Sequence, residues 1–429
     1  MKKLVSVIGA SILMLTLLFG LAGCGSDNDS GAEQIVIWAW DPAFNIAALE
    51  LAAEFFNAEN PDVEIIIEEV AFDSIVQQLN IAFAAGTMTG LPNIALVEQY
   101  QSQVFLQNFS EHFYPIGNRV NTNNFAGYTV PIHSHNGVMY GVPFDTGAIG
   151  MFVRHDILAQ AGFSVEDVYM IDWWEALEIS EAVFEATGVR MFSQNLAATG
   201  GYARMNMTAS GTWYTGADGQ TVNINNSPSI RRAVEVLKEF VDRDLVMHHG
   251  DANTMHANWH TSQVWAVPGA VWLTPSVMLD DGLSGQWTLV PYPRLPDVQG
   301  ATNFGNMGGS AWYILDVPGY EIAAEFLSFT FGNNLEFHEA LLTEIGALSV
   351  FTPLANSPVL SEPHPFFGGQ PIFQQFSIWA NNIPQFNVGL HTYFGNSLIS
   401  TAIVEILEEG RDIDDALNAA QHHADTQLN

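Results

Sequence analysis

Basic residues are scarce in this sequence. Twelve lysines and arginines stand against 46 aspartates and glutamates, and the formal net charge at pH 7 is −34. Nucleic-acid binding that neutralises phosphates needs clustered positive charge, so the composition excludes that function. It also argues against electrostatic docking on anionic lipid. Because few ion pairs can offset repulsion among the acids, we expect stability to rise with added salt or with mild acidification toward about pH 5.

Cysteine is scarcer still, since Cys24 is the only one. This excludes a disulfide framework and a cysteine-ligated zinc cluster. Two lysines precede an apolar run over residues 4–21, and the sequence Leu-Ala-Gly-Cys follows at its end, as is typical of a secretory signal. The end resembles the lipobox of bacterial lipoproteins, which implies a signal peptide over 1–23, lipidation of Cys24 and a flexible tether over 24–31. The alternative is an uncleaved membrane anchor.

The body of the chain is rich in the side chains that form cores. It contains 28 phenylalanines, 11 tryptophans and 11 tyrosines, which excludes a disordered acidic chain. Its 429 residues exceed the size of one ordinary core, so we expect two domains or two lobes of one unit. We find no internal repeat and no low-complexity block beyond the tether.

The first part of the body alternates between strand-like and helix-like segments. Residues 35–38, 63–70 and 92–97 are apolar or rich in β-branched side chains. Between them, 48–56 and 75–83 place apolar side chains at helical spacing. The order strand, helix, strand, helix, strand predicts a parallel α/β sheet with right-handed crossovers.

The second part of the body contains sequence signals for the starts of two helices. Asp172 and Glu175 have the spacing of a capping box, and Pro228 stands where the first turn of another helix is expected. Residues 264–272 and 287–292 are apolar runs that predict strands. The remainder of the chain is again predicted to be mostly helical.

Seven short motifs follow one another along the chain. They are I-V-I-W-A-W-D at 35–41, L-P-N-I-A-L-V-E-Q at 91–99, G-V-P-F-D-T-G at 141–147, D-W-W-E at 172–175, G-A-V-W at 269–272, G-G-S-A-W at 308–312 and I-P-Q-F at 383–386. Each motif is weak alone. Their order and spacing, behind a lipobox-like segment, resemble an extracellular solute-binding protein of a bacterial ABC importer, from the carbohydrate-binding family 1 that includes maltose-binding proteins.

The resemblance implies an α/β fold of the periplasmic-binding-protein type II, with two lobes, hinge crossings and a ligand cleft between the lobes. The N-terminal lobe would comprise 32–142 plus 305–350, and the C-terminal lobe 143–304 plus 351–429. The protein would be a monomeric, lipid-anchored component on the outer face of the cell membrane. It would deliver a sugar or oligosaccharide to the permease subunits of the transporter, with no enzyme activity, cofactor or metal.

A sugar site needs flat aromatic platforms and fixed hydrogen-bonding groups, because sugars present apolar C–H faces and hydroxyl edges. In α/β lobes such groups follow the carboxyl ends of strands. We therefore select side chains after the predicted strands, and add positions that the resemblance indicates. The candidates for ligand contact are Trp40, Asp41, Phe44, Asp73, Glu98, Gln99, Tyr100, Asp145, Trp213, Tyr214, Trp272, Gly309, Trp312 and Trp379. Asp73 could equally cap a helix, and Trp38 is predicted to be core because it alternates to the opposite face.

Other functions remain open from the residues alone. A secreted glycoside hydrolase also combines aromatics with paired carboxylates, and no motif selects one acid pair. A polyamine-binding relative of the same fold is a second alternative, because acids and aromatic rings also suit a cation. His256 and His260 have helical spacing, but the H-E-x-x-H pattern lacks its glutamate here, so a zinc protease is not expected.

Overall fold

A computed structural model describes Glu33 to Leu428 of the chain. The predicted signal peptide, the tether and Cys24 lie outside the described residues. Within the described part, no helix is both long and apolar enough to cross a membrane.

The first sheet has five strands in the order β2-β1-β3-β12-β6. β1 pairs in parallel with β2 and with β3, and β12 runs antiparallel to β3 and β6. The helices α1 and α2 connect the three parallel strands, which confirms the predicted alternation. The bounds are β1 Glu33–Ala39, α1 Ala47–Asn57, β2 Val63–Glu69, α2 Phe72–Ala84, β3 Ile94–Glu98, β6 Gly141–Pro143 and β12 Ser310–Ile314.

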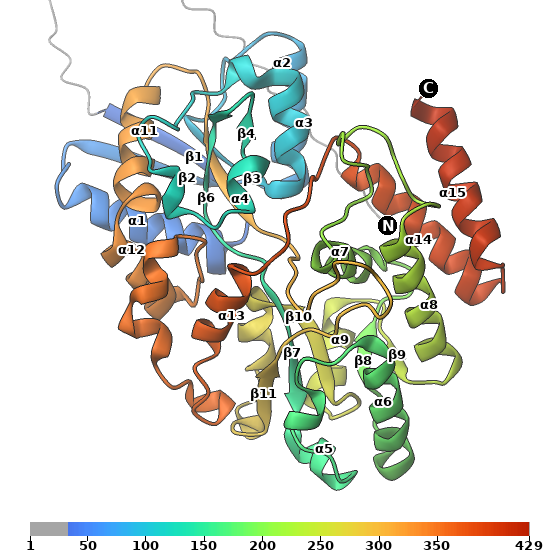
Figure 1. The fold of residues 1–429 in the computed structure, drawn as a ribbon. Coiled ribbons are helices and arrows are strands. Elements are labelled where there is room, and N and C mark those ends of the chain that lie inside the picture. Colours follow the sequence, from blue (N-terminus) through green and yellow to red (C-terminus); the bar gives the residue numbers. More distant parts are fainter. Residues whose placement is uncertain (1–32, 429) are drawn as a thin grey trace, which may run out of the picture. The chain divides into compact units, whose positions relative to one another are not determined.

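Two separate apolar clusters cover the two faces of this sheet. On one face α1 packs with α11 (Tyr320–Leu327) and α12 (Leu335–Ala340), and on the other α2 packs with α3 (Gln99–Phe109) (Figure 1). Alternate residues of a strand point to opposite faces. Ile37 therefore joins the α1 face and Trp38 the α2 face, where it is 7% exposed, which confirms the predicted core position of Trp38.

The second sheet has three antiparallel strands in the order β10-β7-β11. All residues of the central strand β7 are buried, as expected where both faces are covered. Both predicted apolar runs of this region form strands, each shorter than expected. The bounds are β7 Ile149–Arg154, β10 Ala266–Ala270 and β11 Trp287–Val290, with α5 His155–Gln160, α6 Trp173–Thr187, α8 Pro228–Asp242 and α13 Ile372–Ala380 around them.

The predicted helix starts of this region are confirmed. Asp172 accepts hydrogen bonds from the backbone of Trp174 and Glu175, while the Glu175 side chain accepts from the Asp172 N–H, which completes the capping box of α6. Pro228 begins α8. At α2 the structure differs, because Ala71 occupies the N-cap position and Asp73 lies one residue inside the helix. The predicted cap at Asp73 is therefore wrong.

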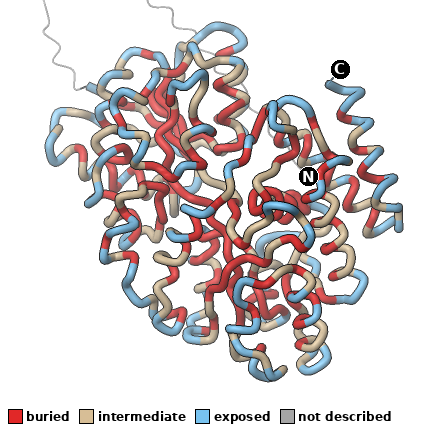
Figure 2. The backbone as a smooth tube through the Cα atoms, viewed as in Figure 1, coloured by how far each residue is buried: buried red, intermediate tan, exposed pale blue. Residues whose placement is uncertain are grey.

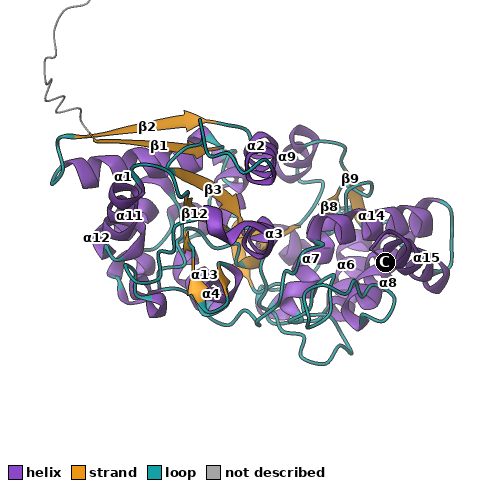
Figure 3. Cartoon of the chain, turned by 90° about the horizontal axis from the view of Figure 1, so that it is seen from above, coloured by secondary structure: helices purple, strands orange, loops and turns teal. Residues whose placement is uncertain are grey.

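The remaining elements include two short strand pairs and further helices (Figure 3). β4 (Ser134–His135) pairs with β5 (Val138–Met139), and β8 (Phe192–Gln194) pairs with β9 (Val246–His248). The further helices are α4 Thr129–Ile132, α7 Gly200–Ala209, α9 Ala252–His260, α10 Thr274–Val277, α14 Thr392–Glu408 and α15 Ile413–Leu428.

Three chain segments run between the two sheets, and they touch one another there. The segment after β6 forms isolated bridges from Asp145 to Ser349 and from Ala148 to Asn306. These four residues are buried. They belong to the buried stretch of chain that connects the two sheets (Figure 2). The ends of β1 and β3 and the segment before β12 meet beside these bridges, and this junction positions the site described next.

Candidate functional site

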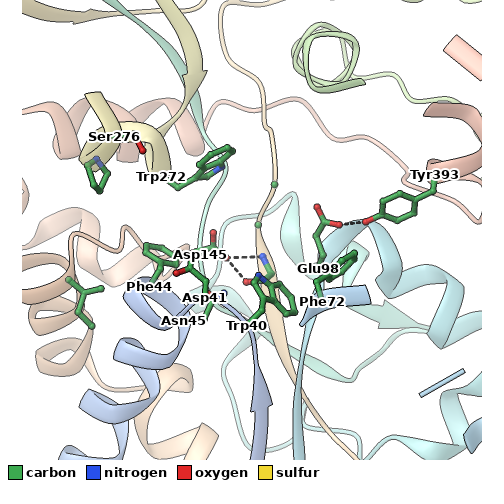
Figure 4. A pocket seen from close by; sticks show the side chains of 15 residues that line it. Trp40, Asp41, Phe44, Asn45, Phe72, Glu98, Asp145, Trp272, Ser276 and Tyr393 are labelled. Carbon is green, nitrogen blue, oxygen red and sulfur yellow. Dashed lines mark hydrogen bonds between the residues drawn. The ribbon is translucent and has the colours of Figure 1, made fainter. Parts of the chain in front are cut away.

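A pocket of about 650 Å³ opens where the ends of β1 and β3 face the segment after β10. Trp40, Asp41 and Phe44 come from the exit of β1, whereas Trp272 and Ser276 come from the opposite wall (Figure 4). Its wall consists of Trp40, Asp41, Phe44, Asn45, Phe72, Glu98, Asp145, Trp272, Pro275, Ser276, Gly308, Gly309, Ser310, Ile345 and Tyr393.

Five aromatic rings line this pocket. Trp40 and Phe72 meet edge to face, with ring centroids 5.2 Å apart. Trp272 stands in a 3₁₀ turn over Val271–Leu273 and is 40% exposed, although its indole Nε1–H donates to the Met307 carbonyl at 2.9 Å. That hydrogen bond holds the exposed ring in one orientation, so a ligand would find the platform already in place.

Asp145 supplies a fixed carboxylate at the floor of the pocket. Its Oδ1 accepts hydrogen bonds from the Ser310 backbone N–H at 2.8 Å and from the Ser310 hydroxyl at 2.6 Å. Burial raises the pKa of Asp145, and the two Ser310 hydrogen bonds act against that shift. The group is an acceptor whose direction is set before any ligand arrives.

Glu98 carries a second carboxylate, which links the end of β3 to α14. Its Oε2 accepts a hydrogen bond from the Tyr393 hydroxyl. Burial raises the pKa of Glu98, while the Tyr393 hydrogen bond and the charge of Arg204 lower it. Burial also raises the pKa of Tyr393, and Glu98 adds to that increase because its charge disfavours a phenolate. The hydroxyl therefore stays protonated and donates.

Asp41 is the third carboxylate on the wall, and its backbone is unusual. It adopts φ +60°, in the left-handed region that aspartate tolerates better than most residues. Its carbonyl accepts the N–H groups of Asn45 and Ile46, so the chain turns sharply at the end of β1. The turn places Phe44 and Asn45 on the same wall as Trp40.

Gly308 and Gly309 form the part of the wall made of backbone. Both have positive φ, at +92° and +105°, which side chains other than glycine rarely adopt. A Cβ at Gly308 would lie 3.2 Å from the Trp272 Nε1, and one at Gly309 would lie 3.1 Å from the Gln99 Oε1. The sequence Gly-Gly therefore allows the close approach of the Trp272 and Gln99 side chains.

Half of the predicted contact residues line the pocket, namely Trp40, Asp41, Phe44, Glu98, Asp145, Trp272 and Gly309. Three others lie close behind the wall or beside it. Gln99 donates from its side-chain amide to the Gly308 carbonyl, and the Tyr100 hydroxyl accepts from the Gly308 N–H at 2.8 Å. Asp73 is exposed in the first turn of α2, next to Phe72, which lines the pocket instead.

The other four predicted residues are buried elsewhere. Trp213 stacks on Phe386, and Tyr214 donates to Asn396 at 3.0 Å. Trp312 points from β12 to the α1 face of the first sheet, and Trp379 of α13 packs on Phe376. These side chains are at most 4% exposed, because each fills a core rather than the pocket.

Several lining residues were not predicted from the sequence, namely Asn45, Phe72, Pro275, Ser276, Ser310, Ile345 and Tyr393. Phe72 had a usable signal, because it is the first residue of α2 and comes three residues after the end of β2. Tyr393 stands seven residues after the I-P-Q-F motif. Nothing local marks it, because it reaches the pocket through the placement of α14.

Metal ligation has no support from the geometry. Among residues 33–428, no three histidine, cysteine, aspartate or glutamate side chains are grouped so that they could hold a metal ion. The His256 and His260 rings lie 6.3 Å apart on α9.

The chain is similar to several known proteins. The model of the family "Bacterial extracellular solute-binding protein" matches residues 51–362. The lactose-binding protein of Rhizobium radiobacter is 33% identical over 92% of this chain and 93% of its own length. Among solved structures, the sugar-binding protein MalE of Xanthomonas citri has a TM-score of 0.76 at 16% identity, and covers 92% of this chain and 97% of its own.

A third similar protein is the galacto-N-biose/lacto-N-biose I-binding protein of Bifidobacterium longum. It has a TM-score of 0.73 at 20% identity, and covers 94% of this chain and 98% of its own. These two structural likenesses confirm the predicted α/β fold of the periplasmic-binding-protein type II.

Proposed function

Because the chain belongs to the bacterial extracellular solute-binding proteins, we propose that it is the sugar-binding component of an ABC importer. Members of this family are binding proteins that lie outside the cytoplasm, and the sugar-binding members work with membrane permeases. The site of the present chain would be the pocket at the ends of β1 and β3.

The observation that supports this function is the combination of side chains around the pocket. Five aromatic rings offer apolar faces, and Asp41, Glu98 and Asp145 offer carboxylate oxygens. A pyranose needs both, because its C–H groups lose unfavourable contact with water on an aromatic ring while its hydroxyls donate to fixed acceptors. An apolar ligand would cover these carboxylates without donating any hydrogen bond to them, which is costly in a desolvated site.

The size of the pocket favours a small saccharide. Its volume of about 650 Å³ lies within the range of roughly 300–1,000 Å³ that is typical of small-molecule sites. A relative that is 33% identical is named a lactose-binding protein. We therefore propose a disaccharide as the preferred ligand and lactose as the first one to test.

Binding would be coupled to transport through closure of two lobes. We propose the N-terminal lobe as 32–142 plus 305–350 and the C-terminal lobe as 143–304 plus 351–429. The sugar would contact Trp40 and Glu98 of the N-terminal lobe and Trp272 of the C-terminal lobe. It would thereby stabilise a closed form, which the permease recognises. No bond in the sugar is broken in this scheme.

The protein is further proposed to be a monomer held at the cell surface by a lipid on Cys24. The support is the lipobox-like sequence that ends at this single cysteine. Labelled fatty acid should be incorporated by the wild type and not by Cys24→Ala in growing cells. Equal labelling of the two would contradict the anchor but would leave sugar binding untouched.

The function is tested by titration of the purified protein with a panel of neutral mono-, di- and oligosaccharides. We expect saturable binding of at least one disaccharide, at one site per chain, with the sugar recovered intact after long incubation. Failure to bind any saccharide would contradict the proposal. Turnover of a glycoside would also contradict it and would favour a hydrolase.

A further inference from the structure

The charged groups on the pocket wall are all acidic. Asp41, Glu98 and Asp145 line the pocket, and among its described lining residues none is a lysine, arginine or histidine. We infer that the site selects its saccharide by charge: it accepts a sugar that carries a protonated amine and rejects one that carries a carboxylate. This inference rests on the proposed function and names the class of saccharide that the pocket takes.

Glu98 is the carboxylate best placed to sense such a charge. Asp145 already uses its Oδ1 for two hydrogen bonds from Ser310. Glu98 accepts the Tyr393 hydroxyl through Oε2, and within the described part of the chain its Oε1 has no hydrogen-bond donor. An ammonium group in the pocket could therefore donate to Glu98 without displacing an existing partner.

Arg204 of α7, whose charge acts on Glu98, does not line the pocket and so is not placed to bind an anionic ligand there. Its guanidinium carbon lies 5.3 Å from the centre of the Tyr100 ring, and its Nη1 donates to the Asn396 Oδ1 at 3.2 Å. Its charge lowers the pKa of the Glu98 carboxyl, while burial, the larger effect, raises that pKa.

The aromatic rings favour a cation in the same way. A positive charge is attracted to the face of an aromatic ring, most strongly to tryptophan, and the pocket has Trp40 and Trp272 on its wall. An anion would instead lose its hydration beside carboxylates of the same sign. At an effective dielectric constant near 20, one such repulsion at about 6 Å corresponds to roughly a 100-fold loss of affinity.

The test compares derivatives of one sugar in titrations of the wild-type protein at neutral pH. The probes are the tightest-binding neutral disaccharide of the panel, its analogues with an amine at C2 or C6 of either ring, and its analogues with a carboxylate at C6 of either ring. We expect at least one amine analogue to bind as tightly as the parent or more tightly. We expect each carboxylate analogue to bind at least about 30-fold more weakly.

Two results would overturn the inference while the proposed function stands. One is a carboxylate analogue that binds within about threefold of the neutral parent, and the other is a loss of more than about tenfold for every amine analogue. If no neutral saccharide binds but a linear polyamine does, the proposed function fails and the ligand is a cation without a sugar ring.

The role of Glu98 is tested separately with Glu98→Gln. The variant should reduce the ratio between the affinities of amine and neutral probes by about tenfold, because the amide keeps the size but not the charge. Glu408→Gln is the matched control, since Glu408 is exposed at the far end of α14, and it should leave the ratio unchanged. An unchanged ratio in Glu98→Gln as well would refute charge selection by Glu98.

Discussion

Acidification should unfold this protein more readily than its charge alone suggests, because two histidines are buried in the core. His338 is fully buried and stacks on Phe351 with ring centroids 4.1 Å apart, and among residues 33–428 its Nδ1 has no hydrogen-bond partner. His133 is 1% exposed, and its Nδ1 lies 2.9 Å from the Tyr313 hydroxyl. Burial lowers the pKa of each imidazole from 6.5 to about 3.

The direction of the effect follows from proton linkage. A histidine whose pKa is lower in the folded state takes up its proton mainly on unfolding, so protons favour the unfolded chain. No stability is lost above pH 6.5. Below it, each group removes stability as the pH falls toward about 3. At pH 5 the loss is about 2 kcal/mol per histidine, or about 4 kcal/mol for both, against a typical total of about 5–15 kcal/mol.

Other groups act in the opposite direction. Burial raises the pKa of Glu98 and Asp145, so the folded state gains from protons at these two sites, and acid also reduces the repulsion among carboxylates. Composition alone led us to expect stabilisation toward pH 5. The buried histidines oppose the expected gain from acid, and we now predict a net loss of folding stability between pH 7 and pH 5.

The assay is urea unfolding of wild type and His338→Phe at about pH 7.5 and about pH 5. The phenylalanine keeps the stack on Phe351 but cannot be protonated. The free energy difference between the two proteins should change by about 2 kcal/mol between the two pH values, in favour of the variant at low pH. The exposed substitution His422→Gln is the control. A difference that does not depend on pH would refute the reasoning.

Three further predictions concern charge and the pocket wall. The unfolding temperature should rise from about 0.05 to about 1 M NaCl because salt screens the net charge of −34, and an unchanged midpoint would contradict this. Gly309→Ala should lower stability by about 1–3 kcal/mol in urea unfolding, because φ is +105° and the Gln99 Oε1 is 3.1 Å from the new Cβ. The control is Gly250→Ala, whose new Cβ would have no atom within 4 Å, and it should lower stability by less than about 1 kcal/mol. Tyr393→Phe should weaken sugar binding about 3- to 30-fold in calorimetric titration by removing the donor to Glu98, and equal affinities would refute the role of that hydroxyl.

Much of the fold could be predicted because its signals are local. The alternating segments of the first sheet, the capping box at Asp172 and the start of α8 at Pro228 depend on neighbours within a few residues. The rule that sites follow strand ends also selected Trp40, Asp41 and Glu98, which line the pocket. These features needed no knowledge of tertiary contacts.

The aromatic residues show where local information stops. Trp312 lies on a strand, so its side chain alternates with that of Tyr313, but alternation does not say which face of the sheet meets the pocket. Trp213 stands in a loop, yet it is buried because Phe386, far along the chain, covers it. Tyr393 reaches the wall through the packing of α14, and that placement is set by tertiary contacts.

The most direct test of sugar binding in this pocket is calorimetric titration of Trp272→Ala with the best disaccharide. The ring is 40% exposed and lies on the wall, so its loss should weaken binding about 30- to 1,000-fold, or about 2–4 kcal/mol. Trp174→Ala is the control, because Trp174 is partly buried beside Arg232 and does not line the pocket; its affinity should equal that of the wild type. Unchanged affinity in a folded Trp272→Ala protein would contradict the placement of the sugar.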